Sequence, residues 1–193
     1  MPIAVQDPTT TAPTAVPGKA DSSKGHPQPT LPGLVRVQRS ALAFGSSAIS
    51  EVSLPAGALF TKITTATPST KAYSSVQVSR DGHIELNSDL VYCNHSCDPT
   101  VNFDMARMEV RVVDDRPLKK GDPLTFFYPS SEWEMDQPFQ CTCGAGEKCK
   151  GFIKGAKGMG REGLKGYWLN GHIEELVREE EEEEEQKKKA DGQ

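Results

Sequence analysis

Three cysteines in the last third of the chain are spaced so that they can act together as metal ligands. Cys141, Cys143 and Cys149 lie in a glycine-rich segment, where Gly144 and Gly146 let the backbone wrap closely round an ion. Zinc takes four thiolate, imidazole or carboxylate ligands in a tetrahedron, and four thiolates leave no open position for water. The spacing therefore predicts a structural zinc site that needs a fourth ligand from elsewhere. Free thiols in a loop are the alternative.

The middle of the chain offers two candidates for that fourth ligand. Cys93 follows the apolar run Leu90-Val91-Tyr92 and is expected to be a small buried hydrophobic residue. Cys97 lies in a polar run and is the better candidate. A zinc ion held by Cys97 and the three later cysteines would pin the end of the chain to its middle.

The composition narrows the class of protein. The chain has 193 residues, 21.0 kDa and 36% hydrophobic residues, enough for one domain with one modest core. Its formal net charge of -5 gives no basic surface for nucleic acid. No apolar stretch approaches the roughly 18 residues of a membrane span, and no signal peptide is visible. Five cysteines is an odd number, which argues against a disulfide framework. We expect an intracellular monomer, in the nucleus or the cytoplasm, with no membrane contact.

Short β-branched and aromatic runs between turn residues predict a mainly β fold from Leu34 onward. In one segment, apolar and polar residues alternate on both sides of the turn Arg80-Asp81-Gly82, which predicts a hairpin. The expected strands are Leu34–Val37, Ala58–Thr64, Ser74–Val78, His83–Leu86, Val101–Phe103, Met108–Val113 and Leu124–Tyr128.

The two ends of the chain differ from this region. Residues 1–32 carry too few apolar side chains to offset the entropy of ordering, which predicts a disordered leader. Near the other end, apolar residues recur at helical spacing and predict a terminal helix with Asn170 as a possible cap. These residues are Leu169, Ile173, Leu176 and Val177.

An acidic run, Glu179–Glu185, and the lysines 187–189 follow this helix. Glutamates four residues before lysines stabilise a helix by about 0.2–0.5 kcal/mol per pair, so the helix can extend a little into this segment. The segment is either a solvated tail or an acidic arm for a basic partner such as a histone tail.

Three motifs together resemble one known family. Asn94–Pro99, Lys120–Tyr128 and the segment from Phe139 to Ile153, with its Cys-x-Cys-Gly and Cys149, are similar to the C-terminal half of a SET domain with its post-SET zinc motif. Ser40–Gly45 and Leu54–Phe60 resemble the opening of that domain more loosely. The resemblance spans about residues 34–153.

The resemblance implies an S-adenosylmethionine-dependent protein lysine N-methyltransferase with a compact, pseudoknotted β fold and a zinc-binding post-SET knuckle. It assigns cofactor binding to Asn94, His95, Phe44, Gly45 and Phe152, and it makes Tyr128 the residue that orients the lysine amine. The substrate would be a lysine-bearing protein, for which a histone is one candidate. The residues expected along the lysine channel are Phe126, Phe127 and Trp133; ordinary core packing is the alternative for Phe126 and Phe127.

The chain departs from the family pattern in several places, two of which bear on cofactor and substrate binding. Ala43-Phe44-Gly45 stands where members usually have Gly-x-Gly, and the stretch between Phe60 and Asn94 is too short for the usual insert that walls the peptide groove. Two other functions therefore stay open, a non-catalytic zinc-stabilised interaction module and a tailoring enzyme that acts on a small molecule.

The expected segments follow from these assignments. They are the leader 1–32, a SET-like domain 33–136, the zinc knuckle 137–156, a helical segment 157–178 and the charged tail 179–193.

Overall fold

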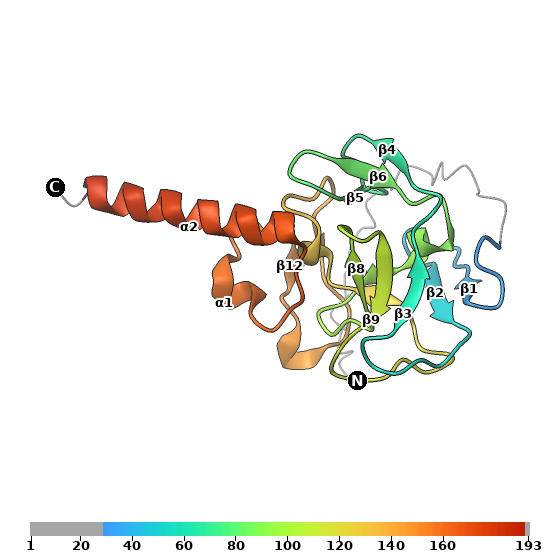
Figure 1. Ribbon diagram of the computed structural model, residues 1–193. Coiled ribbons are helices and arrows are strands. Elements are labelled where there is room, and N and C mark those ends of the chain that lie inside the picture. The colour runs from blue at the N-terminus through green and yellow to red at the C-terminus, as the bar shows by residue number, and fades with distance from the viewer. Residues whose placement is uncertain (1–28, 192–193) are drawn as a thin grey trace, which may run out of the picture.

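The computed structural model describes residues 29–191, and the body of the molecule is built from short strands in five small sheets (Figure 1). Two sheets have three strands. One has the order β3 (Leu59–Lys62), β9 (Glu109–Val112), β8 (Val101–Asp104), and the other has the order β4 (Thr67–Ser69), β6 (His83–Glu85), β5 (Val76–Gln77). The prediction of a mainly β fold is confirmed.

The other three sheets are strand pairs, and short helices connect them. The pairs are β1 (Val35–Gln38) with β2 (Ser47–Ser50), β7 (Asn94–His95) with β10 (Thr125–Phe126), and β11 (Phe139–Gln140) with β12 (Phe152–Ile153). The helices are the 3₁₀ turns η1 (Asp89–Tyr92), η2 (Tyr128–Ser130) and η3 (Gly146–Lys148), and the α-helices α1 (Gly160–Leu164) and α2 (Gly171–Asp191).

The main hydrophobic core packs against one face of the antiparallel pair β8–β9. Val101 lies opposite Val112 and Phe103 lies opposite Val110. These four side chains share one face of the strand pair, and all of them are fully buried. The Phe103 ring also stacks on Phe126 of β10, with ring centroids 4.2 Å apart. The β-branched and aromatic runs that predicted these strands therefore supply the main core.

The predicted hairpin around Arg80-Asp81-Gly82 is confirmed, since β5 pairs antiparallel with β6 and Val76 lies opposite Ile84. The third strand of this sheet, β4, was not expected. Its sequence Thr-Pro-Ser has little β propensity, and Pro68 is tolerated because β4 is an edge strand.

A second apolar cluster joins the C-terminal segment to this body. Ile153 and Leu164 pack there with Ile173 and Val177 of α2. Figure 1 shows α2 leaving the body beside β12 and α1 and carrying the C-terminus away from the sheets. The first turns of α2 are therefore packed, while the rest of the helix projects from the body.

Asn170 precedes α2 as predicted, but its side chain does not cap the helix. Its backbone carbonyl accepts the N–H groups of Ile173 and Glu174, as the cap position requires. The side-chain amide instead donates to the carbonyls of Phe103 and Ser130 and accepts the N–H of Met105. Because these backbone groups are buried, the Asn170 side chain serves to join α2 to β8 and η2.

Helix α2 does not end at residue 178 but continues through the acidic run to Asp191. Ion pairs accompany this extension, with Lys188 and Lys189 each 3.8 Å from the glutamate four residues earlier. Arg80 pairs with Glu179, which ties the β5–β6 turn to α2. The charged tail is therefore continuous with the packed helix.

The expected leader lies outside the described residues except for its last four. Of these, Thr30 and Leu31 are fixed, because their N–H groups donate to Asp89 Oδ2 at 2.8 and 2.9 Å. The ordered fold therefore begins before residue 33. No helix within residues 29–191 combines the length and the apolar composition that a membrane span needs.

Candidate functional site

The parallel pair β7–β10 brings two of the predicted motifs together. Asn94 lies opposite Thr125 and His95 opposite Phe126. Tyr128 follows directly, and its backbone N–H donates to His95 Nδ1 at 3.2 Å. Two segments that are about thirty residues apart in sequence thus form one site.

The His95 ring links this site to the cysteines. Burial lowers the pKa of His95 to about 4, so the ring is neutral. Because Nδ1 accepts the Tyr128 N–H, the ring proton lies on Nε2, which is 3.3 Å from Cys97 Sγ. Both ring nitrogens are therefore engaged within the protein, and any contact from His95 to a cofactor must use its backbone or the ring face.

A hydrogen bond and two ring contacts hold the Tyr128 side chain. Its hydroxyl donates to the carbonyl oxygen of Cys93 at 3.2 Å, and its ring contacts those of His95 and Phe126 at 5.2 and 4.7 Å between centroids. Burial raises the pKa of the Tyr128 hydroxyl well above its usual range. The group therefore stays protonated and acts through hydrogen bonds, not as a base.

Tyr128 and Phe126, one of the residues expected along the substrate channel, line a narrow cavity of about 80 Å³. Exposed residues, among them Tyr73, Ser74 and Gln137, lie on the side that faces solvent. The remaining lining residues are Ala72, Ser75, Val76, Leu86, Leu90, Val91, Cys93, Glu132, Met135 and Asp136.

The other two residues expected along the channel lie elsewhere, which corrects the prediction for them. Phe127 turns away from the cavity, and its ring stacks on Tyr167 with centroids 3.7 Å apart. This follows from the alternation of side chains on a strand, which places Phe126 and Phe127 on opposite faces. Trp133 is not among the lining residues either, and it packs in the second apolar cluster.

Glu132 is a site residue that the sequence analysis missed. Its side chain is 8% exposed, and its Oε1 accepts the N–H of Gln77 at 2.8 Å. Burial raises the pKa of Glu132 to about 7. No local sequence pattern indicates Glu132, because its position depends on contacts made by the fold, among them the bond from its N–H to the Tyr128 carbonyl.

Two of the residues predicted to hold the cofactor, Phe44 and Gly45, lie in the loop before β2, and Asn94 contacts this loop. Asn94 Nδ2 donates to the carbonyl of Ser46 at 2.9 Å, which fixes this loop to β7. Phe44 is 74% exposed, and its ring meets Tyr73 edge-on at 5.9 Å between centroids. A Cβ on Gly45 would lie 2.6 Å from Ser40 Oγ, so Ser40 would have to move to admit a side chain there.

Phe152, the last of the predicted cofactor residues, lies in β12. It is 58% exposed and pairs with Gln140. The neighbouring Phe139 ring lies 5.6 Å from His95 and 6.1 Å from Tyr128 between centroids. Exposed aromatic rings such as Phe44 and Phe152 can stack on the flat aromatic adenine of S-adenosylmethionine, so their chemistry suits that cofactor.

The four predicted zinc ligands come together, and Cys93 does not join them. The sulfur atoms of Cys97, Cys141, Cys143 and Cys149 all lie within 4.8 Å of one another, and Cys97 Sγ lies 3.9 Å from Cys141 Sγ. Tetrahedral zinc with bonds of about 2.3 Å requires sulfurs about 3.8 Å apart, so the donor set fits this ion.

Backbone donors around the sulfurs favour thiolates. The Lys150 N–H lies 3.3 Å from Cys97 Sγ, and the Cys97 N–H lies 3.5 Å from Cys143 Sγ. Although burial opposes it, the N–H groups of Cys97 and Ala145 lower the pKa of the Cys143 thiol to about 7. Gly144, Gly146 and Gly151 all have positive φ, which confirms that glycines wrap the backbone round the cluster.

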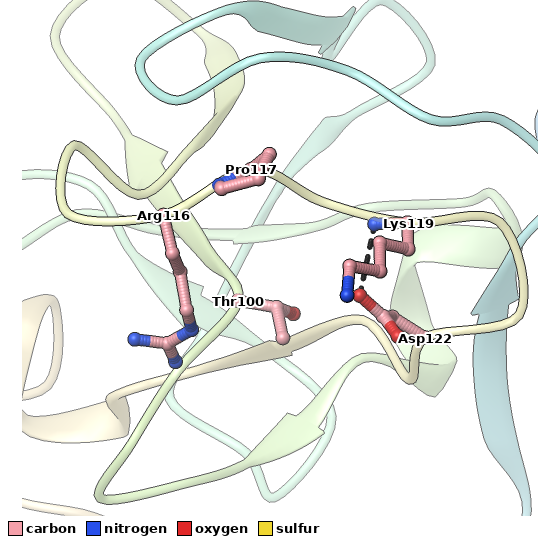
Figure 2. Close-up of a pocket in the computed structure, with 5 residues that line it drawn as sticks. All are labelled: Thr100, Arg116, Pro117, Lys119 and Asp122. Atoms are coloured by element: carbon pink, nitrogen blue, oxygen red, sulfur yellow. Dashed lines mark hydrogen bonds between the residues drawn. The ribbon is translucent and has the colours of Figure 1, made fainter.

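A larger cavity of about 290 Å³ lies at the turn before β10 and contains none of these groups (Figure 2). Its polar residues are engaged with one another and with the backbone. Asp122 accepts the N–H of Lys119 at 2.8 Å, and Arg116 donates to the carbonyl of Asp98 at 3.1 Å. The narrow cavity at Tyr128 is therefore the better candidate active site.

Comparisons with known proteins identify the family of the chain. A model of the SET domain family matches residues 21–129, which include Asn94, His95 and Tyr128. The chain is also 54% identical over 151 residues to the protein named Methyltransferase flvH from Aspergillus flavus. The aligned part covers 78% of this chain and 84% of that relative.

Proposed function

Because the chain belongs to the SET domain family, we propose that it transfers a methyl group from S-adenosylmethionine to an amine held in the cavity at Tyr128. The family and the relative support a methyltransferase. The observation that favours this cavity is the fixed, protonated Tyr128 hydroxyl, held by the Cys93 carbonyl in a narrow aromatic space.

The proposed chemistry needs a neutral amine in line with a sulfonium methyl group, which the bound cofactor supplies. Positioning of this kind can lower a barrier by several kcal/mol without a strong base. Tyr128 provides an oriented hydroxyl oxygen and Cys93 an oriented carbonyl, so two acceptors can take the N–H groups of the amine and leave its electron pair free. The rings of Phe126 and Tyr128 desolvate it, which disfavours its charged form.

The first candidate for the acceptor is the lysine side chain of a protein, as the family resemblance implies. A cavity of about 80 Å³ admits an unbranched alkyl amine and excludes bulky groups. A free small amine satisfies the same requirement without a peptide groove. This second candidate is favoured by the short stretch between β3 and β7, which contains only the small sheet β4–β6–β5 and the 3₁₀ turn η1.

We further propose that Cys97, Cys141, Cys143 and Cys149 hold a structural zinc ion. The sulfur spacing and the donor set support this assignment. Through the contact between Cys97 and His95, such an ion would fix the ring that holds the backbone of Tyr128.

The test is methyl transfer by the zinc-loaded protein to two sets of acceptors, lysine-bearing peptides and small primary amines, followed by mass spectrometry. Tyr128→Phe is expected to lower the rate by about 100-fold or more, because one oriented polar group contributes that much in a desolvated site. Tyr92→Phe is the matched control, since its hydroxyl lies beside Arg39 and outside the cavity.

Transfer to peptides would make the substrate a protein lysine, and transfer to free amines alone would make the protein a small-molecule enzyme. A folded, zinc-loaded protein that methylates neither set would contradict the proposal and favour a non-catalytic interaction module.

A further inference from the structure

The cavity at Tyr128 contains an acidic group that the proposed positioning by Tyr128 does not use. Glu132 is nine-tenths buried and lines the cavity together with Tyr128, Phe126 and Cys93. A buried carboxylate is costly unless a cation pairs with it. Among residues 29–191, no salt bridge involves Glu132.

The groups near Glu132 explain why its charge lacks a partner within the protein. Lys71 attracts the carboxylate but forms no salt bridge with it, and the other titratable groups nearby are two histidines, a tyrosine, a cysteine and an aspartate. His83 is the cross-strand neighbour of Gln77, and His172 contacts the Ser131 carbonyl; burial lowers the pKa of both. The other titratable groups are Tyr128, Cys93 and, near the solvent side, Asp136.

Resting on the proposed function, we infer that Glu132 is a second catalytic residue, which pairs with the ammonium group of the substrate and takes its proton. One N–H bond of the ammonium breaks and leaves its electron pair on nitrogen, while an O–H bond forms on the Glu132 carboxylate. The neutral amine then has the free electron pair that methyl transfer requires. The proton leaves Glu132 for solvent on the side of the cavity at Asp136.

The chemistry of the group suits this role. An alkyl ammonium has a pKa of about 10.4 in water, so nearly all of it is charged at neutral pH. A desolvated cavity lowers that value, and burial raises the pKa of Glu132 to about 7. The pKa of the ammonium and the pKa of Glu132 thus approach each other, which is the condition for efficient proton transfer near neutral pH.

A purely structural role for Glu132 is the alternative. Glu132 Oε1 accepts the Gln77 N–H at 2.8 Å, and Gln77 Oε1 in turn accepts the Trp133 N–H at 2.9 Å. These bonds join β5 to the segment after η2. Because an amide oxygen can accept the Gln77 N–H as well as a carboxylate can, Glu132→Gln keeps this contact and removes only the acid–base function.

The experiment compares the wild-type protein with Glu132→Gln and with the matched control Glu134→Gln, which is exposed and pairs with Lys157. The first measurement is calorimetric binding of n-butylammonium, and of the neutral n-butanol, to the zinc-loaded protein at pH 8. We expect n-butylammonium to bind the wild type and Glu134→Gln equally and to bind Glu132→Gln at least about tenfold more weakly, with n-butanol unaffected. Equal binding to all three proteins, or no binding to the wild type, would overturn the inference.

The second measurement is the pH profile of methyl transfer. General-base catalysis typically contributes about 100-fold or more, so Glu132→Gln should lose that factor while its thermal transition stays close to the wild type. The wild-type rate should fall below about pH 7, and this inflection should be absent from Glu132→Gln. If that variant does not fold, a wild-type profile that is flat between pH 6 and 9 still refutes the role. A wild type that methylates no amine would defeat the proposed function, and the binding measurement would still decide whether Glu132 pairs with an ammonium.

Discussion

Tyr128 and Glu132 show how burial gives two neighbouring groups different roles. Burial raises the pKa of both side chains. The tyrosine thereby stays neutral at every physiological pH and can only offer hydrogen bonds. The carboxyl instead titrates near neutrality, where a small change of environment changes its charge. One desolvated cavity thus contains a fixed hydrogen-bonding group and a titrating one.

The same shift predicts how stability depends on pH. The pKa of Glu132 is about 7 in the folded protein and about 4.5 when unfolded, so folding favours the protonated form. Its contribution to stability is fully present below about pH 4.5 and is lost as pH rises through about 7. The integrated loss is about 3 kcal/mol.

This loss is measured by urea unfolding of the wild type and Glu132→Gln in matched buffers from pH 4.5 to 8. Because both proteins have the same cysteines, zinc effects cancel in the difference. Relative to the variant, the wild type should lose about 3 kcal/mol over this range. A difference that does not change with pH would show that the carboxyl does not titrate there.

At the scale of single residues, sequence motifs indicated Tyr128, Asn94, His95 and the four zinc ligands. They could not indicate Glu132, because its importance comes from burial against β5, a contact 55 positions away in sequence. The motifs also could not show that both ring nitrogens of His95 contact other groups of the protein, the Cys97 sulfur and the Tyr128 N–H.

At the scale of elements, the segment 137–156 depends on the cysteine cluster more than on its strands. Strands β11 and β12 have two residues each, and η3 has three. Elements this short have almost no stability of their own. A metal bound by Cys97 and the three later cysteines would supply the stability that the short β11–β12 pair lacks, because such binding energy is also folding energy.

We therefore expect Cys97→Ser to abolish stoichiometric zinc binding, while Cys93→Ala keeps one zinc per chain. Cys93 is the matched control because it is buried in the main core and lies outside the cluster. Atomic emission of the purified proteins gives the stoichiometry. Zinc retained by Cys97→Ser at the wild-type level would contradict this ligand set.

The same reasoning explains which elements the sequence could predict. Strands β8 and β9 and the hairpin β5–β6 follow from alternating or β-branched side chains that bury one face. Strands β7, β11 and β12 have only two residues each and owe their pairing to distant segments, so no local pattern indicates them. Helix α2 was predicted, but its length was not, because interactions with Arg80 and Arg161 accompany its acidic extension.

At the scale of the whole molecule, three regions distant in sequence meet at one site. The loop before β2 is tied to β7 through Asn94, β7 pairs with β10 ahead of Tyr128, and the cysteine cluster contacts His95. The proposed cofactor, substrate and zinc sites are thus connected by direct contacts. The sequence indicated the members of each site, but only the folded chain shows that His95 contacts both the cysteine cluster and Tyr128.

The most direct test of this account is a calorimetric titration of S-adenosylmethionine into the zinc-loaded protein. We predict saturable binding of one cofactor per chain. Gly45→Ala should weaken it by about tenfold, or about 1.4 kcal/mol, because the added Cβ would displace the loop at Ser40. Gly171→Ala is the control, since a Cβ there meets nothing within 4 Å. A folded, zinc-loaded protein that shows no binding would contradict the account and leave a SET-type scaffold without catalysis.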